Sequence, residues 1–470
     1  MKPLAGLIGS LLLLTPCAAQ EMLEPPSTKY FRSTGSWGQK QADQWGLQRL
    51  GFDASPQSAW RLVKKNAEPV IVALIDTGID WNHRSLDWDN IWRNPNEKIN
   101  GIDDDKNGKV DDVIGWDFFA RNGKPWDMDG HGTMVAGIIA GSWKDADGVA
   151  GINPFARLMI LKAVNNFGHT RSSYVAEALV YAADHGARVI NLSVGGEKTN
   201  KMVTDALDYA YKKGAVIVVA AGNEGVSTED YGLAASDKVL VVGASTVDDQ
   251  HANFSNWGKV SVAAPGVDIL SLRARRTDTL FSPKAIKYIA GTNYVGTDRR
   301  YYRADGTSFA APFVSGLASL MIANDPTLTN QQVINIIKST AKDIGPPGVD
   351  QFTGYGLPDA RAALQAPKDY FLFAGIARVA VTQAAGGQVV RVFGLADADK
   401  FATAQLELGA GETPSSFKKI ASVTKSAAPD GALGDIPTQA LAGSKVWTVR
   451  IVVTHQNGKT REARFRLNLG

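Results

Sequence analysis

The sequence predicts a three-layer α/β fold with a parallel central sheet, followed by a smaller all-β sandwich. Two observations carry this prediction. Between about Trp45 and Leu364, short continuous apolar runs alternate with small-residue segments of helical spacing. Strands without a polar face are typical of parallel sheets that helices cover on both sides. After Pro367, apolar and polar residues alternate between polar turns, which is typical of an antiparallel sandwich.

The individual elements follow from these patterns. Five apolar runs are expected to be buried strands: residues 70–75, 158–164, 187–193, 215–220 and 239–242. Helices are expected at residues 171–186 and 201–214, because each stretch of helical spacing ends at a glycine. In the C-terminal part, strands are expected at residues 388–393, 403–408, 446–453 and 461–467.

The first residues have the layout of a secretory signal peptide. Lys2 precedes an apolar run, and small residues follow the run. The run is shorter than the ~20 residues that cross a bilayer as a helix. We therefore expect cleavage after Ala19, a secreted or periplasmic protein, and no transmembrane segment after signal removal. A lipid anchor on Cys17 is the alternative, and Pro16 directly before it argues against that processing.

Composition narrows the choice of partners. The 50 Lys and Arg residues stand against 47 Asp and Glu residues, a net charge of +3. Such a balance supplies no strong field for a polyanion, so nucleic acid is not expected as a partner. The only cysteine is Cys17, so the mature chain has no disulfide, and bound cations are the obvious alternative source of rigidity. The oligomeric state is not predicted.

Four segments are expected along the chain. They are a signal peptide (1–19), an N-terminal extension (20–44), the α/β domain (45–366) and a C-terminal β-sandwich accessory domain (367–470). The sandwich contains no cluster of catalytic residue types. Its role, either a stabilising cap or a binding module, is left open.

Three residues stand in settings that favour nucleophilic catalysis. Asp76 ends the first strand, at the sheet edge where α/β proteins bind ligands. His131 lies between glycines before a small-residue helix, and Ser308 lies in a Gly-Thr-Ser turn that leads into another helix. Pro312 is expected in the first turn of that helix, where proline removes no hydrogen bond. Taken singly, each residue also fits a structural role, as a turn aspartate, a packed histidine or a helix cap.

In this chain order, the three segments resemble the subtilase family of serine peptidases. The resemblance covers about residues 45–364 through LIDTGID, GHGTMVAG, VINLSVGG, VVAAGNEG, VSVAAPGVDIL, GTSFAAPFVSG and GYGLPDA, all in family order. It implies a subtilisin-like fold for residues 45–366 and endoproteolytic hydrolysis of polypeptide substrates.

The resemblance also implies the roles of the site residues. Ser308 would form the acyl-enzyme, His131 would act as its base, and Asp76 would orient the imidazole. Asn223 would donate to the oxyanion together with the Ser308 amide. An extended substrate would lie against Ser193, Val194, Gly195, Ala220, Ala221 and Gly222.

Two other functions would use the same scaffold. One is a secreted binding or adhesion protein built on a degenerate protease, and the intact triad and oxyanion donor argue against it. The other is peptide ligation, in which the acyl group passes to an amine, and the sequence does not distinguish it from hydrolysis.

A polar insertion between the first strand and His131 predicts a structural Ca²⁺ site. The segment NGIDDDKNGKVDDV places oxygen ligands at alternate positions around a glycine, as in the first part of an EF-hand loop. The expected ligands are Asp103, Asp105, Asn107, the Lys109 carbonyl and Asp112. The glutamate of the twelfth EF-hand position is missing, and a merely solvated acidic turn is the alternative.

Overall fold

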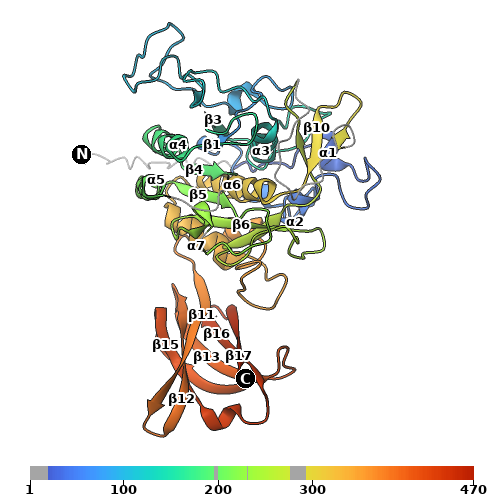
Figure 1. The fold of residues 1–470 in the computed structure, drawn as a ribbon. Helices are drawn as coiled ribbons and strands as arrows, with labels where there is room; N and C mark the ends of the chain where they lie inside the picture. Colours follow the sequence, from blue (N-terminus) through green and yellow to red (C-terminus); the bar gives the residue numbers. More distant parts are fainter. Residues whose placement is uncertain (1–19, 195–199, 230, 276–292, 470) are drawn as a thin grey trace, which may run out of the picture.

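A parallel sheet of seven strands runs through the N-terminal part of the chain in the computed structural model (Figure 1). The structure describes residues 20–194, 200–229, 231–275 and 293–469. All neighbouring strands of this sheet pair in parallel. In spatial order the strands are β2 (Gly115–Asp117), β3 (Ala156–Lys162), β1 (Val70–Asp76), β4 (Val189–Leu192), β5 (Val216–Ala220), β6 (Leu240–Ser245) and β7 (Val262–Pro265).

Helices cover both faces of this sheet. Helices α4 (Ser172–Asp184) and α5 (Lys201–Lys212) pack on one face, and α3 (His131–Ala140), α6 (Thr307–Asn324) and α7 (Asn330–Thr340) pack on the other. Alternate residues of β1 enter two different apolar clusters: Val72 and Leu74 face α6, while Ala73 and Ile75 face α4. This explains why the strands show no polar face. The predicted three-layer α/β fold is confirmed.

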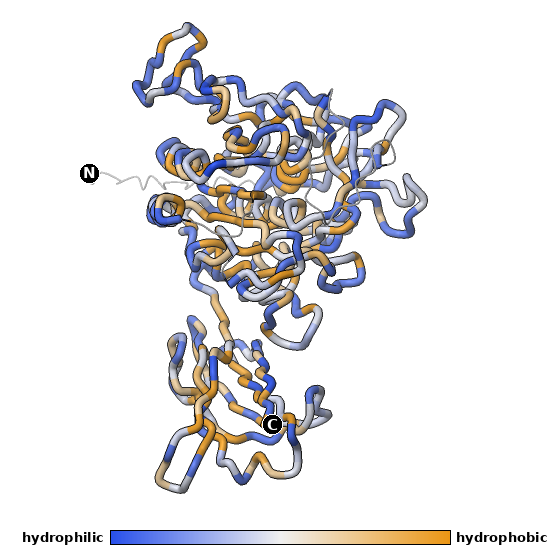
Figure 2. The backbone as a smooth tube through the Cα atoms, viewed as in Figure 1, coloured by the Kyte–Doolittle hydropathy of each residue, from blue (hydrophilic) through white to orange (hydrophobic). Residues whose placement is uncertain are grey.

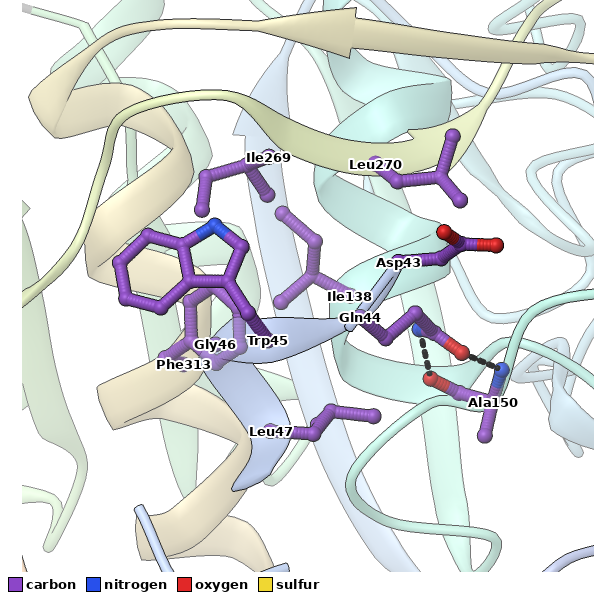
Figure 3. Close-up of a pocket in the computed structure, with 10 residues that line it drawn as sticks. All are labelled: Asp43, Gln44, Trp45, Gly46, Leu47, Ile138, Ala150, Ile269, Leu270 and Phe313. Atoms are coloured by element: carbon purple, nitrogen blue, oxygen red, sulfur yellow. Dashed lines mark hydrogen bonds between the residues drawn. The ribbon is translucent and has the colours of Figure 1, made fainter. Parts of the chain in front are cut away.

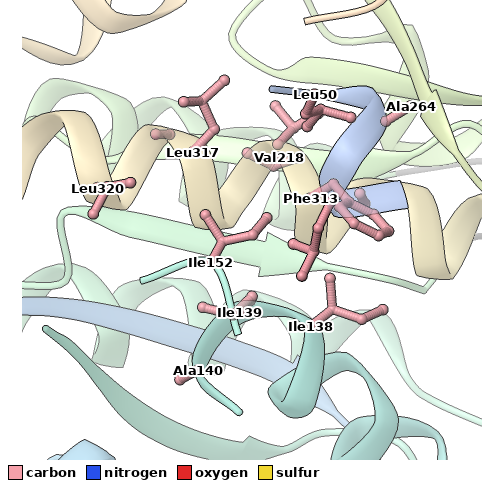
Figure 4. Close-up of a cluster of buried hydrophobic side chains, with 14 of the residues drawn as sticks. Leu50, Ile138, Ile139, Ala140, Ile152, Val218, Ala264, Phe313, Leu317 and Leu320 are labelled. Atoms are coloured by element: carbon pink, nitrogen blue, oxygen red, sulfur yellow. The ribbon is translucent and has the colours of Figure 1, made fainter. Parts of the chain in front are cut away.

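Helix α6 is the main element of its layer. Phe313 and Leu317 of α6 lie against Ile138 of α3 and Ile152 in a buried apolar cluster (Figure 4). Among the described residues, α6 is the one helix with the length and hydropathy of a membrane span, yet 89% of it is buried inside the protein. Packing in the core therefore accounts for its apolar character.

Residues 20–44 pack into the same apolar layer. Tyr30 and Phe31 of the short helix α1 (Lys29–Arg32) are both 2% exposed and belong to the α6-side core. Gln44 precedes helix α2 (Trp45–Arg49), and its side chain donates to the Ala150 carbonyl (2.9 Å) and accepts from the Ala150 amide (2.8 Å) (Figure 3). The segment that the sequence sets apart as an extension thus contributes to the core.

Smaller elements complete this part of the chain. A three-stranded antiparallel sheet packs against α3 through β8. Its strands are β8 (Ile269–Leu272), β10 (Tyr301–Ala304) and β9 (Tyr294–Val295). The remaining helices are the 3₁₀ turns Ala59–Leu62, Trp88–Asn90 and Gly232–Ala235, and α8 (Ala360–Gln365).

The C-terminal part is the predicted antiparallel sandwich. One sheet contains β11 (Leu372–Ala384), β12 (Gly387–Ala398) and β15 (Ala427–Pro437), and the other contains β14 (Lys418–Val423), β13 (Phe401–Ala410), β16 (Val446–His455) and β17 (Thr460–Asn468). Figure 2 shows hydrophobic and hydrophilic residues alternating along these strands. Val392, Leu406 and Ile451 are fully buried between the sheets. Strand β15 escaped prediction because glycine and proline interrupt its pattern.

Arg461 of β17 connects the sandwich to α7. Its guanidinium donates to the carbonyl oxygens of Ser339 (2.9 Å), Ala341 (3.0 Å) and Tyr355 (3.2 Å). Ser339 and Ala341 lie at the C-terminal end of α7, where the carbonyls have no donor within the helix. The sandwich therefore caps a helix that packs on the central sheet.

Replacing Arg461 tests whether this contact stabilises the whole chain. Arg461→Met retains an apolar stem but leaves three carbonyls without their donor, so we expect a loss of about 1–3 kcal/mol in the free energy of unfolding. The loss is measured from the midpoint of urea unfolding, monitored by tryptophan fluorescence. Arg466→Met is the control, because Arg466 on the same strand is half exposed and pairs only with surface groups. Equal midpoints for the two variants would contradict the role of Arg461.

Candidate active site

The three predicted catalytic side chains stand at the ends of three different elements. Asp76 is the last residue of β1, His131 is the first residue of α3, and Ser308 is the second residue of α6. Helices α3 and α6 lie on the same face of the sheet and pack against each other. The fold therefore brings together residues that are far apart in the sequence.

Asp76 and His131 are in direct contact. His131 Nδ1 lies 2.7 Å from Asp76 Oδ1, which also accepts the Thr77 amide at 2.7 Å. Asp76 is buried, and its Oδ2 has no hydrogen-bond partner among the described residues. A buried carboxylate that lacks full hydrogen bonding favours a neighbouring positive charge, because Coulomb attraction is strong where water is excluded.

Glycine is required beside His131 for this contact. A Cβ atom at Gly132 would lie 2.1 Å from the Gly78 carbonyl oxygen and 3.1 Å from Asp76 Oδ1. Any larger residue at position 132 would push α3 away from the end of β1. The glycines that flank the histidine in the sequence are thus explained by the close approach of two backbones.

The charges around His131 change its protonation. Burial disfavours the imidazolium, but the Asp76 carboxylate, with Asp129 and Asp127 further away, outweighs this and raises the pKa of His131 to about 9. The side chain keeps 14% of its surface exposed. In the absence of substrate, the imidazolium therefore predominates below about pH 9, and the neutral imidazole becomes the major form only above that pH.

In the part of the chain that the structure describes, Ser308 makes no hydrogen bond to Asp76 or His131, and it is the neighbouring Phe309 that contacts the His131 ring. The Ser308 hydroxyl donates to the Ser193 carbonyl at 3.2 Å. The ring of the next residue, Phe309, lies 5.3 Å from the His131 ring between centroids. Rotation about the serine Cα–Cβ bond reorients the hydroxyl between staggered positions without moving the helix.

Pro312 is placed differently from the prediction. The helix begins at Thr307, so Pro312 lies inside α6, beyond its first turn. At this position proline removes the N–H that would bond the carbonyl of Ser308, four residues earlier. The Ser193 hydroxyl donates to that carbonyl instead, at 3.0 Å. The freed acceptor is thus satisfied by the segment that follows β4.

Asn223 is held by its side-chain oxygen at the start of α6. Its Oδ1 accepts from the Thr307 amide (2.8 Å) and from the Thr307 hydroxyl (2.9 Å), which orients the side chain. Its Nδ2 donates to no group among the described residues. Asn223 lies in the loop that follows β5. Its hydrogen bonds to Thr307, the first residue of α6, therefore fix its side-chain amide next to the N-terminus of that helix.

The predicted substrate-binding residues follow two neighbouring strands. Ser193 and Val194 come directly after β4, and Ala220, Ala221 and Gly222 lie at the end of β5. Gly195 lies outside the described residues. Gly222 has φ +104°, and a Cβ atom there would lie 2.2 Å from Asn256 Nδ2.

The sequence did not indicate a network that supports this strand end. Glu224 Oε2 accepts from the Asn223 amide (2.8 Å), the Tyr231 hydroxyl (2.7 Å) and Asn256 Nδ2 (3.1 Å). Asn256 also donates to the Ala221 carbonyl at 3.0 Å. Glu224 could have been noticed as the neighbour of Asn223, whereas nothing in the sequence around Asn256 marks its contact.

The acidic insertion folds into a loop in which the predicted ligands separate. Asp103 accepts the amides of Asn107 (3.0 Å) and Gly108 (2.8 Å), as in a simple turn. The Asn107 side chain accepts the Lys109 amide and donates to Asp112 at 2.8 Å. Asp103 therefore bonds only amides of its own loop, whereas Asn107 connects the loop to Asp112.

Two of the predicted ligands, Asp105 and Asp112, lie together with a third carboxylate, Glu97. Glu97, Asp105 and Asp112 each place one oxygen within 4.8 Å of the others, and Glu97 and Asp112 are buried. Asn94 donates to Asp105 (2.9 Å) and to Asp112 (3.2 Å), and Tyr181 donates to Asp112 (2.7 Å). Glu97 was missed because it precedes the loop in the sequence.

Comparison with known proteins identifies the family. A model of the subtilase family matches residues 67–356, which is more than half of the chain. The chain belongs to the subtilase family. The match contains all of the predicted catalytic residues, and the C-terminal sandwich lies outside it.

Relatives of the chain are named as proteases. The chain is 36% identical over 312 residues to the thermophilic serine proteinase of Bacillus sp. (strain AK1), and the match covers 65% of each protein. It is 31% identical over 341 residues to thermitase of Thermoactinomyces vulgaris, covering 72% of this chain and 99% of thermitase. The crystal structure of a lanthipeptide protease superimposes with a TM-score of 0.53 at 25% identity, covering 68% of this chain and 94% of that one. Membership of this family makes the protein a subtilisin-like serine protease.

Proposed function

We propose that this subtilase is an endopeptidase that cleaves polypeptides through an acyl-enzyme on Ser308. The observation that carries the proposal is the 2.7 Å contact between Asp76 and His131 at the end of β1. It stands beside a serine at the N-terminus of α6. A carboxylate, an imidazole and a hydroxyl in this relation are the parts of a nucleophilic triad.

The reaction begins when Ser308 turns from the Ser193 carbonyl toward His131. Neutral His131 takes the hydroxyl proton as the serine oxygen attacks the scissile carbonyl, and Asp76 stabilises the imidazolium that forms. The same imidazolium then protonates the leaving amine, so the peptide bond breaks and an ester to Ser308 remains. Water, deprotonated by His131, hydrolyses the ester and frees the serine.

The negative oxygen of the intermediate is bound by two donors. Asn223 Nδ2 is available because Thr307 occupies only the oxygen of that amide. The Ser308 N–H belongs to the first turn of α6, where amides have no acceptor within the helix. Donors that are already in place need no rearrangement as charge develops, which is why such sites lower the barrier.

The substrate lies extended along the ends of β4 and β5. Main-chain groups of Ser193 and Val194 pair with the substrate backbone as an added strand would. We expect the first specificity pocket beside Ala220, Ala221 and Gly222, the small residues at and directly after the end of β5. The protein acts after secretion or in the periplasm, and the sandwich serves as an accessory domain that stabilises α7.

Substitutions at Ser308 and Asn223 separate nucleophile from oxyanion donor. Ser308→Ala removes the attacking atom, and we expect kcat to fall by roughly 10⁶-fold. For Asn223→Ala we expect kcat to fall by roughly 10²–10³-fold, which is the loss that removal of this donor causes in subtilisin. Initial rates of cleavage of a chromogenic peptide measure both.

Two further variants control for structural effects. Asn223→Asp keeps the oxygen that Thr307 requires but replaces the amide donor with a negative charge that repels the oxyanion, so its kcat should be at least as low as that of Asn223→Ala. Ser319→Ala removes another buried serine of α6, whose hydroxyl bonds the Gly316 carbonyl, and should retain kcat. Equal losses in Ser308→Ala and Asn223→Ala would be evidence against these roles. Products joined to an added amine would indicate ligation instead of hydrolysis.

We also propose that Glu97, Asp105 and Asp112 bind a structural Ca²⁺ ion. Calcium takes carboxylate and carbonyl oxygens, and three like charges within 4.8 Å repel one another unless a cation lies among them. No lysine or arginine of the described residues forms an ion pair with these carboxylates, and the His185 ring nitrogen Nε2 lies 3.8 Å from Asp105. The ion would join the loop to α4, because Tyr181 and His185 belong to that helix end.

Calcium should raise the unfolding temperature of the metal-free protein. Glu97→Gln should remove this increase, because it deletes one charge of the buried cluster. Asp103→Asn should retain it, since Asp103 bonds only amides of its own loop. Differential scanning calorimetry with Ca²⁺ and with chelator measures the shift. If calcium does not raise the unfolding temperature of the wild-type protein, the site is excluded. If Glu97→Gln keeps the increase and Asp103→Asn loses it, the proposed ligand set is wrong.

A further inference from the structure

Asp127 is a buried carboxylate beside the active site that the mechanism above does not use. Its side chain is completely buried, four residues before His131. It accepts five hydrogen bonds. Oδ1 accepts from the Thr77 hydroxyl (3.0 Å) and the amides of Asp129 (3.0 Å) and Gly130 (2.8 Å), and Oδ2 accepts from the amide (2.9 Å) and hydroxyl (2.6 Å) of Thr133.

These five donors come from two separate parts of the active site. Thr77 directly follows Asp76 at the end of β1. Gly130 is the N-cap of α3 and Thr133 lies in its first turn, so both belong to the segment that carries His131. One carboxylate therefore joins the strand that holds Asp76 to the helix that holds His131.

Thr77 closes the connection from the other side. Its hydroxyl donates to Asp127 and accepts the Gly132 amide at 2.9 Å. Lys162, the neighbour of Asp76 on β3, donates to the Thr77 carbonyl. The strand end is thus fixed between β3 and α3 by hydrogen bonds whose members are all buried.

We propose that Asp127, acting with Thr77, is a positioning residue that sets the distance between Asp76 and His131. This inference rests on the proposed function. Nothing covalent links β1 to α3 at this point, and the Asp76–His131 contact depends on the relative position of their backbones. A shift of about 1 Å in a catalytic contact can lower turnover by roughly 10²-fold.

The charge of Asp127 supplies a signature that a merely structural residue would lack. The groups that face His131 are Asp76 from β1 and Asp127 and Asp129 from the loop before α3, and Lys162 of β3 lies near all three carboxylates. Asp127 helps to raise the pKa of His131. Removing its charge should lower that pKa and move the alkaline rise of kcat/KM to lower pH.

Paired variants test the proposal. Thr77→Val keeps the shape of the side chain but removes both hydroxyl contacts, and Thr77→Ser restores them. We expect kcat to fall roughly 10-fold to 100-fold in Thr77→Val and in Asp127→Asn, with KM unchanged and with recovery in Thr77→Ser. In Asp127→Asn the pH profile of kcat/KM should also shift to lower pH.

Active-site titration and a matched control separate positioning from stability. Rates are expressed per site that reacts with a fluorophosphonate. Asp350→Asn serves as the control, because Asp350 also accepts two amides and a threonine hydroxyl in a turn but lies outside the active site. It should lower the unfolding temperature and leave kcat per reactive site unchanged.

The possible results are distinguishable. The positioning role would be overturned if Thr77→Val and Asp127→Asn kept the wild-type kcat per reactive site. In that case any loss of total activity would reflect only a smaller number of reactive sites. If the wild-type protein does not react with the probe, the proposed function fails, and NMR titration of His131 still decides this inference. A His131 pKa that is the same in wild type and Asp127→Asn would overturn it.

Discussion

The hydrogen bond between Asp76 and His131 is the contact on which the rest of the active site depends. It joins the carboxyl end of a central strand to the first residue of a helix, and both elements are fixed by the apolar core on that face of the sheet. The close approach requires glycine at position 132 and a buried polar network around Thr77. Packing of the core and chemistry of the site are therefore parts of the same arrangement.

The site combines buried negative charge with amide donors that are already oriented. Several carboxylates near His131 favour the imidazolium, which is the form that the proposed mechanism requires after the serine has lost its proton. Asn223 is held by its oxygen, and in the proposed reaction its nitrogen donates to the oxyanion. In the proposed mechanism the hydroxyl of Ser308 leaves the Ser193 carbonyl by rotation about a single bond.

The sequence predicted the elements that depend on local patterns. Continuous apolar runs located the buried strands, and ordered motifs located Asp76, His131, Ser308 and Asn223. Prediction from the sequence failed for features whose positions are decided by tertiary contacts. Pro312 lies inside α6 because Ser193 satisfies the carbonyl that the proline leaves free. Glu97 was missed because it precedes the acidic motif, and Asp127 because its bond to the distant Thr77 leaves no mark in the local sequence. The burial of residues 20–44 could not be predicted because it depends on the assembled core.

A structure of the protein after reaction with a fluorophosphonate tests the central claim most directly. The account predicts phosphorus bonded to Ser308 Oγ, with a phosphoryl oxygen about 2.7–3.1 Å from Asn223 Nδ2 and from the Ser308 amide. It also predicts that His131 Nε2 faces the serine oxygen while Nδ1 still contacts Asp76. Phosphorus on another residue, or a His131 ring that has left Asp76 in the adduct, would contradict the account.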